Sequence, residues 1–160
     1  MGKPIGNMAA REYFRYKSKL VPSILSAYES LAAENDVIVI EGAGSPVELN
    51  LNNNDFVNMG LAEMLKAPVL LVGDIDRGGI FAQLCGTLSL LEKNQFELVK
   101  GLIVNKFRGD LTLFEEGKKL LAKRSGKPVL GVMPYAKIDI DDEDSLSERL
   151  ACKKTAETDI

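Results

Sequence analysis

The chain has 160 residues, of which 46% are hydrophobic and 27% are charged, a composition typical of one ordinary globular domain. Its formal net charge of −3 gives no reason to expect nucleic-acid binding, and no run of about 18 apolar residues could span a membrane. The sequence contains no histidine, which excludes Ser-His and Cys-His catalytic pairs and imidazole metal sites within these residues.

The N-terminal residues lack the apolar core of a signal peptide, so we expect a cytoplasmic protein. The two cysteines, Cys85 and Cys152, lie far apart and do not have the spacing of metal ligands. A disulfide framework is not expected in a chain of this size.

Four short apolar runs divide the sequence: residues 37–40 (VIVI), 69–72 (VLLV), 102–104 (LIV) and 129–132 (VLGV). Each run is nearly continuous and not alternating, which is typical of strands buried on both faces of a parallel sheet. Stripes with helical period lie near residues 20–31, 57–65, 80–91 and 113–121, and Asp55 could cap the second of these helices. The alternation predicts an α/β fold: a mostly parallel sheet with helices on both faces, joined by right-handed crossovers.

The periodicity ends near residue 138, and acidic residues dominate the stretch 139–148. A charge run of this kind is usually a solvated segment. We therefore expect a domain over residues 1–138 and an acidic linker or tail over residues 139–160.

Ligands of open parallel sheets bind at the carboxyl ends of the strands, so the residues after each run are candidate site residues. Glu41 follows the first run, where a single carboxylate could hold Mg²⁺ together with nucleotide phosphates. Gly42 and Gly44 would let the backbone approach a phosphate closely. The alternative for Glu41 is a solvated acid at a strand end.

A second cluster follows the run 69–72 and consists of Asp74, Asp76, Arg77, Gly78 and Gly79. The two glycines would open a helix, whose N-terminus suits an anionic oxygen. The arginine could grip a carboxylate or phosphate with two hydrogen bonds. The alternative is a glycine-rich turn with a surface ion pair.

Asn105 and Lys106 follow the third run and begin like the guanine-reading NKxD motif, but Arg108 stands where that motif needs an acid. Guanine specificity is therefore not expected, although the Asn105 amide could contact an adenine edge. Ser125-Gly126-Lys127 is not part of a phosphate loop, because the motif GxxxxGK[ST] occurs nowhere in the chain.

The order of several motifs resembles the cobyric acid synthase family over roughly residues 2–146. The matching stretches are VIVIEGAGSPVELN (37–50), GDIDRGGIF (73–81), GLIVNKFRGD (101–110) and GVMPY (131–135). The family's synthetase domain is similar to dethiobiotin synthetase and has a P-loop NTPase fold. The resemblance implies that ATP and Mg²⁺ activate carboxylates of a corrinoid, adenosylcobyrinic acid a,c-diamide. Ammonia from glutamine then converts four of them to amides, giving cobyric acid.

The resemblance also implies roles by position. Glu41 is then the acid near the metal, and Asn105 with Lys106 contacts the nucleotide. The cluster of residues 74–79 lines the region of the γ-phosphate and the substrate carboxylate. The family's first strand with its phosphate loop and its glutaminase domain have no counterpart here, so we expect a fragment that lacks activity alone. Cys85 cannot replace the glutaminase nucleophile without a histidine.

Two other interpretations remain open. The first is a related nucleotide enzyme, either dethiobiotin synthetase-like or a ParA-like partition ATPase. The second is a non-enzymatic, flavodoxin-like signalling module in which Asp74 would accept a phosphoryl group.

Overall fold

The computed structural model describes residues 6–48 and 56–137. The predicted boundary near residue 138, the acidic tail and the capping residue Asp55 lie outside these ranges. The elements in chain order are α1 (Ala10–Lys17), η1 (Ser18–Leu20), α2 (Val21–Glu34), α3 (Met59–Leu65), β1 (Val69–Asp74), α4 (Ile80–Leu90), α5 (Lys93–Leu98), β2 (Val99–Phe107), η2 (Leu111–Phe114), α6 (Glu115–Ser125) and β3 (Val129–Pro134).

The three strands form one parallel sheet in the order β1-β2-β3. Val72 pairs with Ile103, and Asp74 pairs with Asn105 at the carboxyl end of β1. Three of the four predicted strands and the α/β class with a parallel sheet are thereby confirmed.

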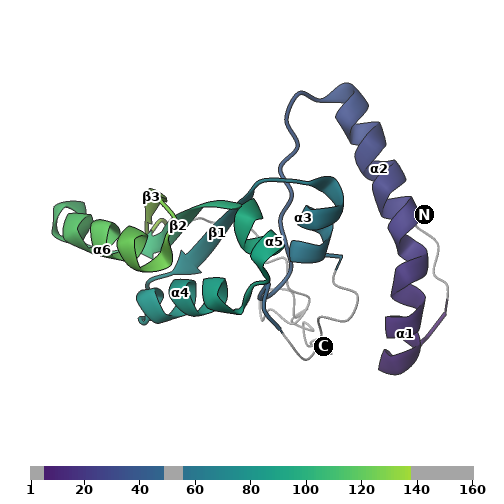
Figure 1. Cartoon of the computed structure of the whole chain (residues 1–160), viewed down its shortest axis with the longest axis horizontal. Coiled ribbons are helices and arrows are strands. Elements are labelled where there is room, and N and C mark those ends of the chain that lie inside the picture. The colour runs from purple at the N-terminus through teal and green to yellow at the C-terminus, as the bar shows by residue number, and fades with distance from the viewer. Residues whose placement is uncertain (1–5, 49–55, 138–160) are drawn as a thin grey trace, which may run out of the picture.

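The core lies between the sheet and the helices α4 and α6, which contact each other. Each helix links a strand to the next parallel strand in the same direction across the sheet, and right-handed crossovers of that kind place both helices on one face. The side chains of Leu84, Leu102 and Leu121 are at most 1% exposed in this layer. Figure 1 shows the two helices beside the sheet.

The opposite face of the sheet is bare among the described residues. The strand β1 alternates, with Leu71 buried and its neighbours Leu70 and Val72 about half exposed. Leu130 on β3 is 58% exposed as well. Within the described residues, helices thus cover one face of the sheet, and the expectation of helices on both faces is met on that face.

The predicted first strand, residues 37–40, is not a strand in the structure. Val37 is 77% exposed and Val39 is 91% exposed, and residues 37–43 pair with no strand within the described ranges. An isolated apolar run gains no ladder hydrogen bonds without a neighbouring strand, whatever its side chains prefer.

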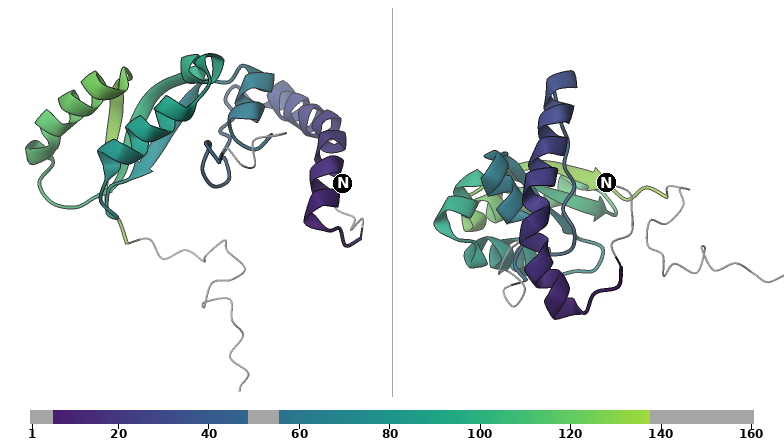
Figure 2. Two further views of the ribbon diagram at one scale, coloured as in Figure 1. Left: turned by 60° about the horizontal axis from the view of Figure 1, so that its bottom comes forward. Right: turned by 90° about the vertical axis from the view of Figure 1, so that its right-hand side faces the viewer.

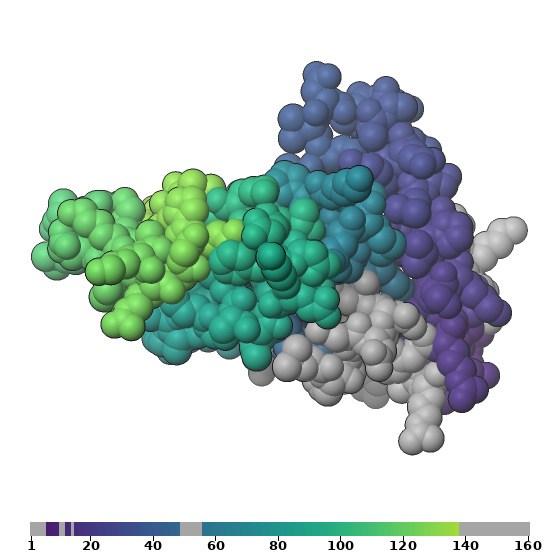
Figure 3. All heavy atoms as spheres, in the orientation of Figure 1, coloured from purple at the N-terminus to yellow at the C-terminus, as the bar shows by residue number. Residues whose placement is uncertain are grey.

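The helices α1, η1 and α2 form a nearly continuous rod that lies apart from the sheet, at the opposite end of the molecule from α6 (Figures 1 and 2). The apolar stripe predicted near residues 20–31 is helical, but no side chain of α2 is buried. The space-filling view shows the resulting elongated shape (Figure 3). No described helix is long and apolar enough to cross a membrane.

Local sequence signals explain where the helices around the sheet begin and end. The helix α5 starts with a capping box formed by Glu92 and Gln95. The helix α6 carries acids in its first turn and bases in its last, and ends at Gly126 with φ of 69°, a conformation that glycine adopts without steric cost. These ends set the lengths of the crossovers, and the parallel pairing of the strands places their three carboxyl ends at one edge.

Candidate functional site

The loops that follow β1, β2 and β3 meet at one edge of the sheet, which we call the strand-end rim (residues 74–79, 105–110 and 135–137). The amide of Ile75 donates a hydrogen bond to the carbonyl oxygen of Asn105 over 3.0 Å. The amide of Tyr135 donates to the carbonyl oxygen of Phe107 over 2.7 Å. Each loop is therefore tied by its backbone to the next, as the rule for parallel sheets predicts.

Asp74, the last residue of β1, is the more enclosed of the two paired aspartates of the rim. Its Oδ2 atom accepts a hydrogen bond from Lys106 Nζ at 2.8 Å, and its Oδ1 atom accepts one from the amide of Asp76 at 2.9 Å. The Nε atom of Arg77 lies 4.0 Å from Oδ2. The hydrogen bond from Lys106 is the main reason why the pKa of Asp74 is lowered, so this carboxylate is ionised at neutral pH.

Asp76 and Arg108 form a second ion pair beside the first. The guanidinium donates through Nε to Oδ1 at 2.6 Å and through Nη2 to Oδ2 at 3.3 Å, which is a bidentate contact. The same contact lowers the pKa of Asp76 and raises the pKa of Arg108. The Cζ atom of Arg108 also lies 3.3 Å from the centre of the Tyr135 ring.

The backbone at Lys106 explains how this side chain reaches Asp74. Lys106 has φ of 60°, in the left-handed region that lysine rarely adopts, and it lies where the register of β2 with β3 shifts between Val104 and Phe107. Its amide donates to Oδ1 of Asn105 over 2.9 Å. Asn105 pairs with Asp74 in the sheet and Lys106 bonds its carboxylate, so the predicted pair Asn105-Lys106 lies beside the predicted cluster around Asp74.

Gly78 and Gly79 precede α4 with φ of 78° and 71°, so the predicted glycine-rich entry to a helix is present. The amide of Gly78 donates to the carbonyl oxygen of Ile75 over 2.9 Å and closes the turn. The first amides of α4 have no carbonyl within the helix to bind, which suits an anionic group at this end. Arg77 beside them has a side chain that is 87% exposed.

Glu41, Gly42 and Gly44 belong to a separate loop between α2 and α3, not to the loops that follow the three strands. Their loop is held instead by Asn58, whose Nδ2 atom donates to the carbonyl oxygens of Ala43 at 2.7 Å and of Ser45 at 3.3 Å. A side chain at Gly42 would collide with Asn58. Among the described residues, no group of three potential metal ligands is found, and the roles of these three residues in metal and phosphate binding stay predictions.

Arg108 and Tyr135 are not among the predicted site residues. In the sequence, Arg108 stands out only because it replaces an acid in NKxD. The signal that could have found it is the matching spacing of Asp74-x-Asp76 and Lys106-x-Arg108 after two adjacent parallel strands, which allows two ion pairs side by side.

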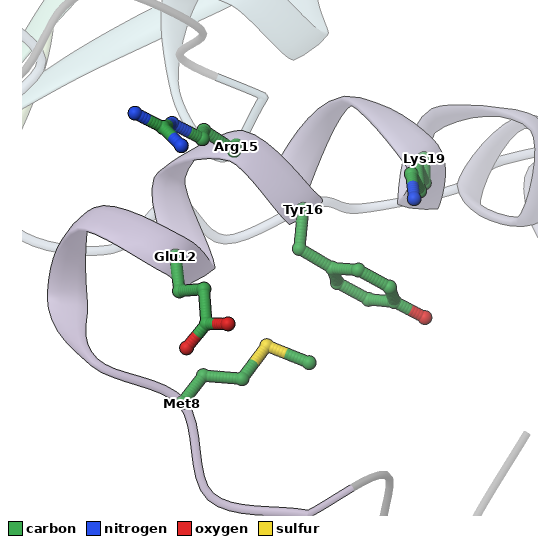
Figure 4. Close-up of a pocket in the computed structure, with 5 residues that line it drawn as sticks. All are labelled: Met8, Glu12, Arg15, Tyr16 and Lys19. Carbon is green, nitrogen blue, oxygen red and sulfur yellow. The ribbon is translucent and has the colours of Figure 1, made fainter.

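Two hollows in the described surface lie outside the rim. One, of about 270 Å³, is lined by residues of α1, of η1 and of the segment before α1: Met8, Glu12, Arg15, Tyr16 and Lys19 (Figure 4). The other, of about 390 Å³, is lined by residues of α4 and α6: Phe81, Ala82, Cys85, Leu120 and Arg124. Neither hollow contains a predicted site residue, and Cys85 packs against the core as expected.

Comparison with known proteins gives one consistent result. The family model described as "AAA domain" matches residues 10–141. The chain is 60% identical over 152 residues to the cobyric acid synthase of Ruminiclostridium cellulolyticum, covering 95% of this chain and 30% of the relative. It is 56% identical over 147 residues to that of Limosilactobacillus reuteri and 54% identical over 147 residues to that of Salmonella gallinarum, each time covering 92% of this chain and 29% of the relative.

The chain thus spans about 30% of the length of the curated relatives it matches. No solved structure matches it significantly. The expected resemblance is confirmed: the chain belongs to the AAA domain family, and nearly all of it is similar to one part of the cobyric acid synthases.

Proposed function

We propose that this chain is part of the synthetase domain of an ATP-dependent amidoligase that converts carboxylates of adenosylcobyrinic acid a,c-diamide to amides. The names of the relatives support this function, and they favour it over a partition ATPase or a signalling module. The single structural observation that carries it is the strand-end rim, where two ionised aspartates and three basic side chains, Arg77, Lys106 and Arg108, lie within reach of one another.

The rim offers the charges that such a reaction needs. A carboxylate oxygen is a poor leaving group, so a substrate carboxylate oxygen first attacks the γ-phosphorus of ATP, and ADP departs. Ammonia then attacks the acyl carbon, and phosphate departs with the carbon–oxygen bond electrons. Both steps gather negative charge on phosphoryl and carboxyl oxygens, which Lys106, Arg77 and the first amides of α4 can stabilise.

Asp74 and Asp76 have a complementary role in this proposal. Their pKa values are lowered, so they stay ionised and can stabilise the positive charge that develops on the nitrogen as ammonia attacks the acyl carbon. Carboxylate oxygens are also the ligands that Mg²⁺ prefers, and these two residues or Glu41 could hold the ion that neutralises the phosphates of ATP. Asn105 is proposed to contact the adenine ring.

The remaining parts of the proposal concern what accompanies this chain. We propose that a glutaminase domain of the same protein supplies ammonia, that the corrinoid is the substrate, and that the reaction takes place in the cytoplasm. The isolated chain, which has no GxxxxGK[ST] motif, is proposed to bind Mg-ATP poorly and to be inactive.

A chimera tests the proposed function. This chain would replace the 152 residues it matches in the Ruminiclostridium cellulolyticum enzyme, and amidated corrinoid would be measured by mass spectrometry with and without ATP. We expect ATP-dependent amidation by the chimera and none by the isolated chain. A folded chimera that binds the corrinoid but forms no amide would contradict the proposal. Tight Mg-ATP binding by the isolated chain in calorimetry would contradict the proposed weak binding.

A further inference from the structure

Arg108 contacts side chains from both neighbouring loops of the rim. It belongs to the loop after β2, and its guanidinium binds Asp76 in the loop after β1 through two hydrogen bonds. Its Cζ atom lies over the ring of Tyr135 in the loop after β3. The backbone bonds described above bring the loops together, but they leave these side chains free to rotate. The side chain of Arg108 is therefore placed to set the orientation of the other two.

The Asp76–Arg108 pair is poorly explained as a device for stability. The side chain of Arg108 is 55% exposed and that of Asp76 is 36% exposed, and exposed ion pairs contribute little to folding. An arginine that is held by two hydrogen bonds and an aromatic ring also loses side-chain entropy. A role for the fixed geometry of Arg108 in the site would account for this loss of side-chain entropy.

If Arg108 acted through its charge alone, any side chain that kept the net charge of this cluster would serve. Within the two ion pairs and the nearby Arg77, three positive charges stand against two negative ones, a net charge of +1. A lysine at position 108 would keep this net charge. It could not, however, make the bidentate contact with Asp76 or stack as a plane on Tyr135.

We infer that Arg108 is a positioning residue of the rim: it holds the Asp76 carboxylate and the Tyr135 ring in one arrangement and so fixes the three strand-end loops relative to one another. This inference rests on the proposed function, because it assigns Arg108 a part in aligning the reacting groups there. A misplacement of about 1 Å at a catalytic group can cost about a hundredfold in rate.

The chimera described above separates positioning from charge. Arg108→Lys and Arg108→Gln are compared with Tyr135→Phe, which keeps the ring, and Tyr135→Ala, which removes it. We expect kcat to fall about ten- to a hundredfold for both Arg108 variants and for Tyr135→Ala, and to fall less for Tyr135→Phe, which keeps the ring beneath the guanidinium. Lys119→Gln is the matched control, since it breaks an exposed 2.7 Å ion pair with Glu116 on α6, in which neither residue belongs to the rim.

The pattern of KM and kcat decides the outcome. An Arg108→Lys variant with unchanged kcat, together with an Arg108→Gln variant that raises only KM, would show that the charge alone matters and would overturn the inference. If Tyr135→Ala lowers the melting temperature as well as the rate, Tyr135→Phe and Arg108→Lys still decide between the two roles.

A second measurement does not depend on activity. Amide hydrogen exchange of the 160-residue chain is compared between the parent and Arg108→Lys. We expect faster exchange of residues 75–79 and 135–137 in the variant, with the amides of β2 unchanged. Equal exchange in both loops would overturn the positioning role. If exchange is faster in the variant as expected but the parent chimera is inactive, the positioning role stands and the proposed function is contradicted.

Discussion

Lys106 combines an unusual backbone with an ion pair at the rim. Its φ of 60° places it in the left-handed region, and its Nζ atom lies 2.8 Å from Asp74. Strain of this kind persists only where the surroundings impose it, and it often occurs at functional sites. No local sequence signal indicates this backbone, because the irregularity in the pairing of β2 with β3 is set by the neighbouring strand.

Two variants separate the strain from the ion pair. Lys106→Ala and Lys106→Gly both remove the contact with Asp74, but only glycine adopts positive φ without steric cost. We expect Lys106→Gly to be more stable than Lys106→Ala by about 1 kcal/mol in urea unfolding. Equal stabilities would show that residue 106 does not hold this conformation in solution.

The ion pairs also predict how Asp76 titrates. Its pKa lies below the ordinary value of 3.8 in the folded chain, chiefly because of the hydrogen bonds from Arg108. A carboxylate with a lowered folded pKa stabilises the fold above its unfolded pKa, and this contribution is lost as the pH falls through the folded pKa. We expect the carboxyl carbon of Asp76 to titrate below pH 3.8 by NMR, and at higher pH in Arg108→Gln. If the titration midpoint of Asp76 is the same in Arg108→Gln as in the parent, Asp76 and Arg108 do not form this contact in solution.

At the scale of elements, close packing of α4 on β1 depends on a glycine. A side chain at Gly73 would meet Ile80 Cδ1 at 2.5 Å and Leu84 Cδ2 at 2.9 Å, whereas nothing lies within 4 Å of the corresponding position at Gly86. This difference could not be predicted from the sequence, in which both glycines are simply small residues next to apolar ones. It follows from the distance between strand and helix.

The two glycines provide a matched pair of substitutions. We expect Gly73→Ala to destabilise the chain by about 1–3 kcal/mol through overpacking. Gly86→Ala lies inside α4 and should stabilise it by up to about 1 kcal/mol, because alanine favours the helix. Thermal unfolding of both variants checks this, and similar effects of the two would mean that α4 does not pack on Gly73.

The strands show what local sequence can and cannot predict. Residues 69–72, 102–104 and 129–132 were predicted as strands, and each lies in the sheet beside another strand. Residues 37–40 have the same apolar character but no strand partner among the described residues, so they are extended and exposed. Composition reports the preference of a segment, whereas pairing depends on residues elsewhere in the chain.

At the scale of the molecule, one layer of side chains between the sheet and two helices holds the described fold together. Leu102 is 0% exposed at the centre of this layer, while Leu113 is 83% exposed in η2. We expect Leu102→Ala to lower the free energy of unfolding by about 2–5 kcal/mol and Leu113→Ala to change it by less than about 0.5 kcal/mol. Comparable losses in urea unfolding would contradict the position of this core.

The rim was predictable in part for the same reason as the sheet. Parallel strands bring their carboxyl ends to one edge, so Asp74, Asp76 and Asn105 could be grouped from the sequence. The contact of Arg108 with Tyr135 could not, since it depends on how the loops beyond the strands fold back. Glu41 follows the run without a strand partner, and its assignment therefore depends on the one strand that was predicted wrongly.

The claim on which the functional proposal depends is that the strand-end rim carries the amidation chemistry. Its most direct test is Asp74→Asn in the chimera, with Glu116→Gln on α6 as the matched carboxylate control. We predict that Asp74→Asn abolishes ATP-dependent amide formation, measured by mass spectrometry of the corrinoid, while the control retains the parent rate and both variants stay folded by circular dichroism. Amide formation by folded Asp74→Asn at the parent rate would contradict the claim.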